Sequence, residues 1–222
     1  MKTFLLLSLL VGGISSPLFA QETFHYRMYD KNTNETLETS AVHFDFSDPA
    51  AIKLTFETGV AASEQKEIYL LDNNYETLSW HVVNAGNGTD YTGKRLGDVL
   101  RIEGRFNGKT VNKDIKIDQN PFFAFPKFEL RPLFLSQRKE PFYNFWAMRQ
   151  DTLEIYKMTA SYQGEETIRV NGKDIKAWKI YWSAANPLFR IFKRTYYYRQ
   201  PDGMFLKQEY PDGRIRELIK EE

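Results

Sequence analysis

The chain contains no cysteine among its 222 residues. This absence excludes disulfide bonds, thiol catalysis, thiolate metal sites and attachment of a lipid to a lipoprotein cysteine. The sequence also lacks a Gly-x-Ser-x-Gly nucleophile elbow and a glycine-rich phosphate loop. Neither sign of charge predominates, since the formal net charge is +1, so no bulk electrostatic attraction to nucleic acid is expected. We therefore assign no catalytic residue, no metal site and no cofactor, and expect no nucleic-acid partner.

Histidine is scarce, with three residues in the whole chain, His25, His43 and His81. Each stands between apolar neighbours in an alternating segment, so we expect each on the solvent-facing side of a strand. A metal site would require two of them to converge with a carboxylate such as Asp45, and no short ligand spacing indicates one. The acidic pair Glu165-Glu166 is expected at a turn, as solvated charge.

Long apolar runs are absent except at the start of the chain. Lys2 is followed by an apolar stretch over residues 4–14 and by a small residue at Ala20. This order is typical of a secretory signal peptide, and the stretch is too short to span a bilayer. We expect cleavage between Ala20 and Gln21, with an uncleaved anchor as the alternative. The protein is then periplasmic, or alternatively secreted, and residues 21–222 form a single antiparallel β domain.

Aromatic residues are abundant, at 15% of the chain, and they recur with period two. This composition and this spacing are typical of β-strands with one buried face. One-sided strands belong to antiparallel sheets that cover a core on one side. Three runs carry the pattern most clearly: Val42, Phe44 and Phe46; Ile52, Leu54 and Phe56; Leu100, Ile102 and Phe106.

Asn-Gly pairs at 107–108 and 171–172 predict tight hairpins, because both residues tolerate the positive φ angles that such turns require. Two-residue loops place apolar residues opposite each other, and oppositely charged residues opposite each other, across each hairpin. The expected pairs are Leu100 with Ile115, Arg101 with Asp114, Ile168 with Ile175, and Arg169 with Asp174.

Pro-Asp-Gly occurs at 201–203 and again at 211–213, ten residues later. Proline at the second turn position and glycine at the closing position predict two further hairpins. The second hairpin places Lys207 opposite Glu217, Leu206 opposite Leu218 and Phe205 opposite Ile219. Residues 188–219 are therefore predicted to form a three-stranded meander.

The segment 120–146 is dense in phenylalanine and proline and does not fit the meander. Repeated proline disfavours a long strand or helix there. One interpretation is a bent crossover between two halves of a sheet, whose rings fill one end of the core. The other is a lid over an apolar cavity or a patch that touches lipid, in which case Phe125 and Phe128 contact the ligand.

Basic and aromatic residues alternate near residue 195 in a way that places them on one face of a strand. Arginine offers forked donors to phosphate or carboxylate, and rings offer apolar or sugar-stacking surface. This face is our candidate binding surface for an anionic lipid or glycan, with a nearby strand adding two tryptophans. The alternative is that the tyrosines pack in the core beside acidic partners. The candidate residues are Arg190, Phe192, Arg194, Tyr196 and Tyr198, with Trp178 and Trp182.

The last 60 residues or so resemble a family of uncharacterised exported bacterial envelope β-proteins, a domain of unknown function. The matching features are the run Gly164–Gly172, the strand around Ala177–Tyr181, Tyr197–Arg199, and the turns at Pro201–Gly203 and Asp212–Gly213. That family is similar in outline to lipoprotein-carrier half barrels. The resemblance implies an open or half-barrel curved antiparallel sheet, with an aromatic crossover covering its concave face, in a Gram-negative envelope. It carries over no catalytic residue.

An integral outer-membrane barrel is disfavoured because 27% of residues are charged and the chain ends in Ile219-Lys220-Glu221-Glu222. Three other functional classes remain. The best-supported class is a non-catalytic binding module for a lipid or another apolar envelope component. The alternative is a structural protein that docks another envelope protein through a sheet edge or an aromatic patch. An envelope hydrolase ranks third, since it would require His, Asp or Glu side chains to converge in a cleft.

Overall fold

The computed structural model describes residues 21–59, 65–131, 142–186 and 193–222. Residues 1–20, the predicted signal peptide, lie outside these ranges. The described part forms one sheet of fifteen strands and a single short α-helix. Its first half contains β1 (Glu22–Asp30), β2 (Thr36–Asp45), β3 (Ile52–Thr58), β4 (Gln65–Leu71), β5 (Thr77–Asn84), the 3₁₀ turn η1 (Ala85–Asn87), β6 (Thr89–Leu96), β7 (Val99–Phe106) and β8 (Lys109–Lys116).

The second half follows a segment that leaves the meander. It contains β9 (Phe122–Phe123), α1 (Pro126–Glu129), β10 (Phe142–Arg149), β11 (Glu154–Val170), β12 (Lys173–Ala184), β13 (Arg194–Arg199), β14 (Phe205–Glu209) and β15 (Arg214–Glu221). Within the described ranges no helix is long and apolar enough to cross a membrane.

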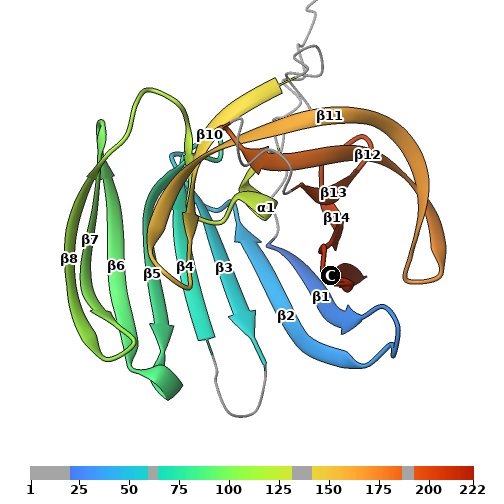
Figure 1. Cartoon of the computed structure of the whole chain (residues 1–222), viewed down its shortest axis with the longest axis horizontal. Coiled ribbons are helices and arrows are strands. Elements are labelled where there is room, and N and C mark those ends of the chain that lie inside the picture. Colours follow the sequence, from blue (N-terminus) through green and yellow to red (C-terminus); the bar gives the residue numbers. More distant parts are fainter. Residues whose placement is uncertain (1–20, 60–64, 132–141, 187–192) are drawn as a thin grey trace, which may run out of the picture.

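The first and last strands join the two halves. β1 pairs with β15 antiparallel, so the strand order runs from β8 down to β1, then from β15 down to β9. Figure 1 shows the sheet curling around a core. The sheet stays open, because its two edge strands, β8 and β9, do not pair with each other. All pairings are antiparallel except that of β9 with β10. The predicted all-β fold, a curved open antiparallel sheet, is confirmed.

The hairpin registers agree with the turn chemistry. Both Asn-Gly hairpins pair as predicted, Leu100 with Ile115, Arg101 with Asp114, Ile168 with Ile175, and Arg169 with Asp174. Asn107 and Asn171 adopt φ angles of 50° and 45°. In the C-terminal meander, Lys207 faces Glu217 as expected. The described strands of that meander begin at Arg194, because residues 187–192 lie outside the described ranges.

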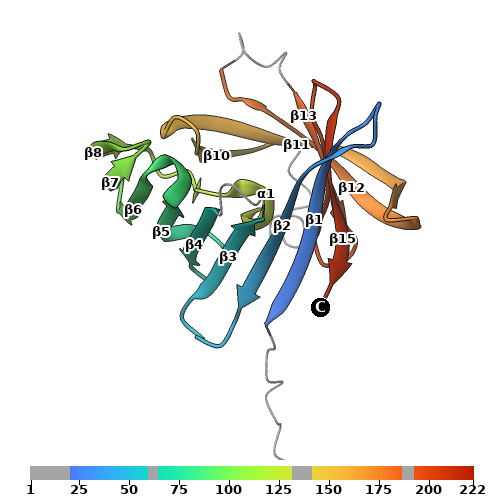
Figure 2. The ribbon, with the colours of Figure 1, turned by 90° about the horizontal axis from the view of Figure 1, so that it is seen from below.

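The aromatic segment after β8 runs inside the curve of the sheet, and we call residues 117–131 the plug. Figures 1 and 2 show α1 on the concave side, between the two halves of the sheet. Four of its rings, Phe122, Phe123, Phe125 and Phe128, are almost fully buried. Where the structure describes it, the crossover therefore fills the core. The expected irregular stretch ends earlier than predicted, because residues 142–149 form β10.

One turn fixes the end of the plug against the sheet. Gly203 has a φ of +68°, and a Cβ added there would lie 2.3 Å from the backbone oxygen of Arg131. Gly213 occupies the matching position of the second Pro-Asp-Gly turn, with a φ of +87° and its nearest such contact at 3.8 Å, to Asn32. The two glycines thus share a left-handed backbone and differ in their contact with the plug.

Replacing each glycine by alanine separates these two effects. We expect Gly213→Ala to lower the free energy of unfolding by about 1 kcal/mol, the cost of the left-handed backbone. Gly203→Ala should lower it by roughly 1–3 kcal/mol more, because the plug must shift. Urea denaturation of both variants measures the difference. Equal losses would show that the contact with Arg131 relaxes at no cost.

Candidate functional site

A polar cavity of about 270 Å³ lies on the concave side of the sheet, at the end where β2, β4 and β15 begin and β3 ends. We call it the inner cavity. Sheet, plug and the turn after β10 all contribute to its wall. Its lining consists of Glu38, Phe56, Thr58, Gln65, Glu67, Phe125, Lys127, Gln150 and Arg216.

Strand alternation explains why these side chains meet. In β3, Phe56 and Thr58 follow the buried Leu54 at intervals of two, and in β4 Gln65 and Glu67 precede the buried Tyr69 in the same way. The inner face that is apolar along most of each strand thus becomes polar at this end.

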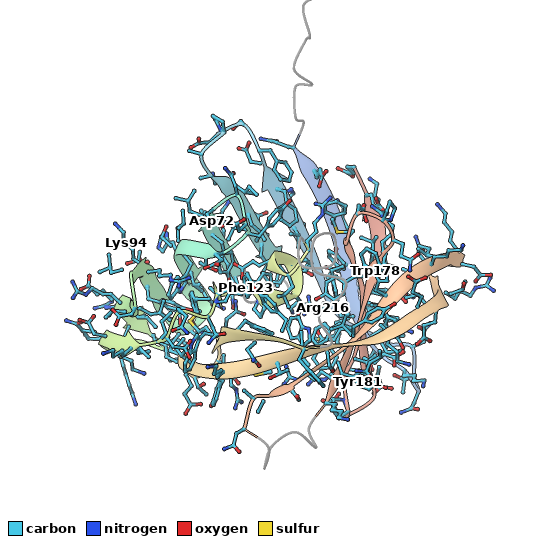
Figure 3. The ribbon with its side chains drawn as sticks, turned by 90° about the horizontal axis from the view of Figure 1, so that it is seen from above. Asp72, Lys94, Phe123, Trp178, Tyr181 and Arg216 are labelled. Atoms are coloured by element: carbon cyan, nitrogen blue, oxygen red, sulfur yellow. The ribbon has the colours of Figure 1, made fainter. Side chains whose placement is uncertain are left out.

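Two cations face the inner cavity. Arg216 is buried, and its guanidinium donates to Glu38 at 2.8 Å and to Ser40 at 2.9 Å. Its Nε makes no hydrogen bond within the described residues. Figure 3 places Arg216 near the middle of the molecule, close to α1, with Lys94 at the periphery.

Lys127 comes from the plug and is partly buried. Its Nζ lies 5.0 Å from the centroid of the Phe125 ring, and no carboxylate of the described residues forms an ion pair with it. Burial lowers the pKa of Lys127 well below its ordinary value, and the Arg216 charge lowers it further. An anion in the inner cavity would oppose both effects and favour the charged ammonium.

Glu67 supplies a carboxyl group to the same wall and is fully buried. It accepts hydrogen bonds from Gln65 at 2.5 Å, from Gln150 at 2.6 Å and from the Tyr69 hydroxyl. Burial raises the pKa of Glu67, although these hydrogen bonds and Lys127 oppose the shift. The oxygens of Glu67 are already occupied by these three donors. We therefore expect Glu67 to position Gln65 and Gln150, and not to contact a ligand itself.

A larger space of about 580 Å³ adjoins the inner cavity, and the two share Gln65 and Gln150. We call it the outer chamber. Its lining adds neutral amides, two rings and three arginines: Val82, Asn84, Asn87, Thr89, Tyr91, Phe106, Asn107, Arg149, Asp151, Arg194 and Arg214. Arg149 pairs with Asp151 at 2.6 Å and Arg214 with Asp212 at 2.7 Å, whereas no described carboxylate forms an ion pair with Arg194.

The residues proposed from sequence as a binding surface are mostly core residues. Tyr196 and Tyr198 are buried, and Trp182 stacks on Tyr196 with ring centroids 3.8 Å apart. Trp178 is likewise buried. These four side chains are therefore packed in the core, as in the alternative interpretation of the tyrosines, because the concave face of β12 and β13 turns toward the plug.

The remaining candidates divide between the cavities, the core and the ranges outside the described part. Arg194 lines the outer chamber and Phe125 lines the inner cavity. Phe128 is buried among other rings. Arg190 and Phe192 lie outside the described residues. A ligand role for these side chains stays a prediction.

Sequence reasoning missed Glu67, Lys127 and Arg216. Alternation could have placed Glu67 on the inner face of β4, two residues before Tyr69. However, Ile68 and Leu70, on the opposite face of β4, are also apolar. The sequence therefore does not decide which face of this strand points into the core. Arg216 stands in a run where four consecutive residues, 215–218, are buried, so both faces of the strand are covered and each face carries one charged residue.

The histidines take no part in either cavity. His43 interacts with Thr23 at 2.9 Å and His81 with Asp90 at 2.8 Å, on the outer face of the sheet. Among the described residues no three His, Asp or Glu side chains gather as metal ligands would. The pair Glu165-Glu166 lies inside β11 next to the bulge at Gly164, so the expectation of a turn there was wrong.

No family model and no curated protein matches the sequence. Among solved structures, the chain is similar to a beta-barrel-like protein of the domain of unknown function DUF1849 from Brucella abortus. The TM-score is 0.60 and the identity 13%, over 91% of this chain and 97% of that one. The two proteins share a fold. A protein from Bacteroides fragilis described as a "putative exported protein with YmcC-like fold" aligns with a TM-score of 0.32 and 10% identity, over 90% of this chain and 95% of that one.

Proposed function

We propose that this protein is a non-catalytic binding module of the cell envelope that holds the anionic group of a lipid-like ligand in the inner cavity. The observation that carries the proposal is the environment of Lys127, a partly buried amino group with no carboxylate partner among the described residues, beside the unpaired Nε of Arg216. A partly buried ammonium without a counter-ion is unfavourable, so Lys127 takes up its proton more readily when an anion is bound beside it.

The walls around these cations suit an amphiphile. Phe56 and Phe125 line the same cavity, and the centroids of their rings lie 4.7 Å apart. Rings beside forked and point-charge donors bind an anionic head group together with its first methylene groups. Export of the mature chain through the leader at residues 1–20 is part of the proposal, and it would bring the protein to the compartment of such ligands.

Docking through a sheet edge is the alternative, and the β8 edge gives it less support. That strand exposes Lys109, Lys113 and Lys116. Lysines along an edge strand are a common protection against the addition of another strand.

The binding test uses dihexanoyl phosphatidic acid below its micelle concentration, titrated into the purified protein in a calorimeter. We expect Lys127→Met to weaken binding at least about tenfold, since a charge-assisted contact contributes roughly 1.5–3 kcal/mol. The matched control, Lys94→Met, removes an exposed lysine of β6 and should leave the affinity unchanged. Absence of binding by the wild-type protein, or equal affinities for both variants, would overturn the proposal.

A further inference from the structure

The outer chamber was not assigned by any sequence feature, apart from Arg194. Its volume of about 580 Å³ falls within the roughly 300–1,000 Å³ of small-molecule sites. Because it shares Gln65 and Gln150 with the inner cavity, a molecule with its anionic group at Lys127 and Arg216 would extend into the chamber. The chemistry of the chamber therefore describes the next part of the ligand.

Neutral hydrogen-bonding groups are concentrated there. Asn84 donates to Gln65 at 3.2 Å, and the Oδ1 of Asn87 accepts from the backbone of Thr89 at 3.1 Å. The Nδ2 of Asn87 and the side-chain amide of Asn107 make no hydrogen bond within the described residues. Donors and acceptors of this neutral kind match hydroxyl groups, which donate and accept at the same atom.

An apolar ring completes the chamber. Phe106 is partly exposed and packs edge-on against Tyr91, with centroids 6.1 Å apart. A ring next to amides suits a saturated ring with hydroxyls at its edge and C–H groups on its face. Arg194, without a carboxylate partner among the described residues, adds a donor for a second acidic substituent.

We infer that the outer chamber binds a sugar ring, and that the ligand class is a sugar phosphate, with the phosphate in the inner cavity and the sugar in the outer chamber. This inference rests on the proposed function for the position of the phosphate. The sugar phosphate can be free or linked to a lipid, and the chemistry recognised by the chamber is the same in both cases.

The test compares glucose 1-phosphate with inorganic phosphate by calorimetry. We expect the wild-type protein to bind glucose 1-phosphate about tenfold more tightly than phosphate, because the sugar adds one or two hydrogen bonds worth roughly 0.5–1.5 kcal/mol each. Asn107→Gly removes the free amide and suits the φ of 50° at that position. It should reduce the preference to less than about threefold.

Asn171→Gly is the matched control, since Asn171 has a φ of 45° in an equivalent Asn-Gly turn and lines neither cavity. It should keep the wild-type preference. Equal affinities for the two probes, or a preference that survives Asn107→Gly, would overturn the sugar assignment.

Lys127→Met distinguishes this failure from failure of the proposed function. Suppose that the wild-type protein binds phosphate and glucose 1-phosphate equally, and that Lys127→Met abolishes phosphate binding. The anion site is then supported and the sugar site is refuted. If Lys127→Met binds both probes as the wild type does, both proposals fall. A short-chain phosphatidylglucoside identifies the source: tighter binding than glucose 1-phosphate supports a glycolipid, and equal binding supports a free sugar phosphate.

Discussion

Phe128→Ala is expected to lower the free energy of unfolding by about 3–5 kcal/mol, the range for truncating a buried phenylalanine. Phe128 is 2% exposed, and its ring contacts rings from both halves of the sheet. The centroid distances are 5.1 Å to Tyr26, 6.4 Å to Phe56, 4.9 Å to Phe125 and 5.2 Å to Phe205. Removing the ring leaves a cavity that none of these strands can close alone.

Phe142→Ala is the matched control, because Phe142 is 61% exposed at the start of β10. Its truncation should change the free energy of unfolding by less than about 0.5 kcal/mol. Urea denaturation followed by tryptophan fluorescence measures both variants. Similar small losses for the two phenylalanines would mean that the plug packs loosely and does not hold the halves together.

The plug connects stability with the candidate site. Lys127 stands between Phe125 and Phe128 in sequence, and the burial of both rings fixes its backbone. A plug that loosens would withdraw the ammonium from the inner cavity. We therefore expect site and core to be coupled, with the rings acting on the ligand through the position of Lys127.

Local chemistry made much of the fold predictable. The turns at Asn107-Gly108 and Asn171-Gly172 fix their hairpins because few residues adopt positive φ, and one residue of slip would put charged groups on the core face. The pairing of Lys207 with Glu217 follows in the same way from the Pro-Asp-Gly turn at 211–213, which lies between them. These signals lie within a few residues of the strands they join.

Pairing between distant segments left no such signal. β1 and β15 lie at opposite ends of the described chain. Each is flanked by two strands, and the sequence does not indicate which of the many hydrophobic strands is the distant partner. The path of the plug is set by the space that fifteen strands enclose. Alternation also gives no decision where both faces of a strand are buried. For this reason Arg216 was not singled out from sequence, and the packing of Tyr196 and Tyr198 in the core was only one of two interpretations.

The plug is also anchored by one buried carboxyl group, that of Glu129. The Thr77 hydroxyl lies 2.7 Å from Oε1, and the Phe125 backbone N–H donates to Oε2 at 2.8 Å. Thr77 in turn accepts from the backbone N–H of Ala124 at 2.8 Å. Burial raises the pKa of Glu129 to about 8, against these hydrogen bonds and with a smaller contribution from Glu67. At neutral pH the carboxyl group is therefore protonated.

This raised pKa gives the stability a defined dependence on pH. The folded protein keeps a proton that the unfolded chain releases at its ordinary pKa of 4.5, so the free energy of unfolding falls as pH rises from that value through about 8. Between pH 6 and pH 9 the loss from this group should be on the order of 2–3 kcal/mol. Glu67, whose pKa is also raised, acts in the same direction.

Glu129→Gln isolates the contribution of Glu129, because a glutamine can accept from Phe125 and donate to Thr77 without titrating. We expect the variant to match the wild type near pH 6 and to exceed it by about 2–3 kcal/mol at pH 9, in urea denaturation at both values. Glu165→Gln, at an exposed position of β11, should keep the wild-type slope. A wild-type slope in Glu129→Gln would show that the carboxyl group is already ionised at pH 6, and the plug would then be held by a buried carboxylate accepting from Thr77 and Phe125.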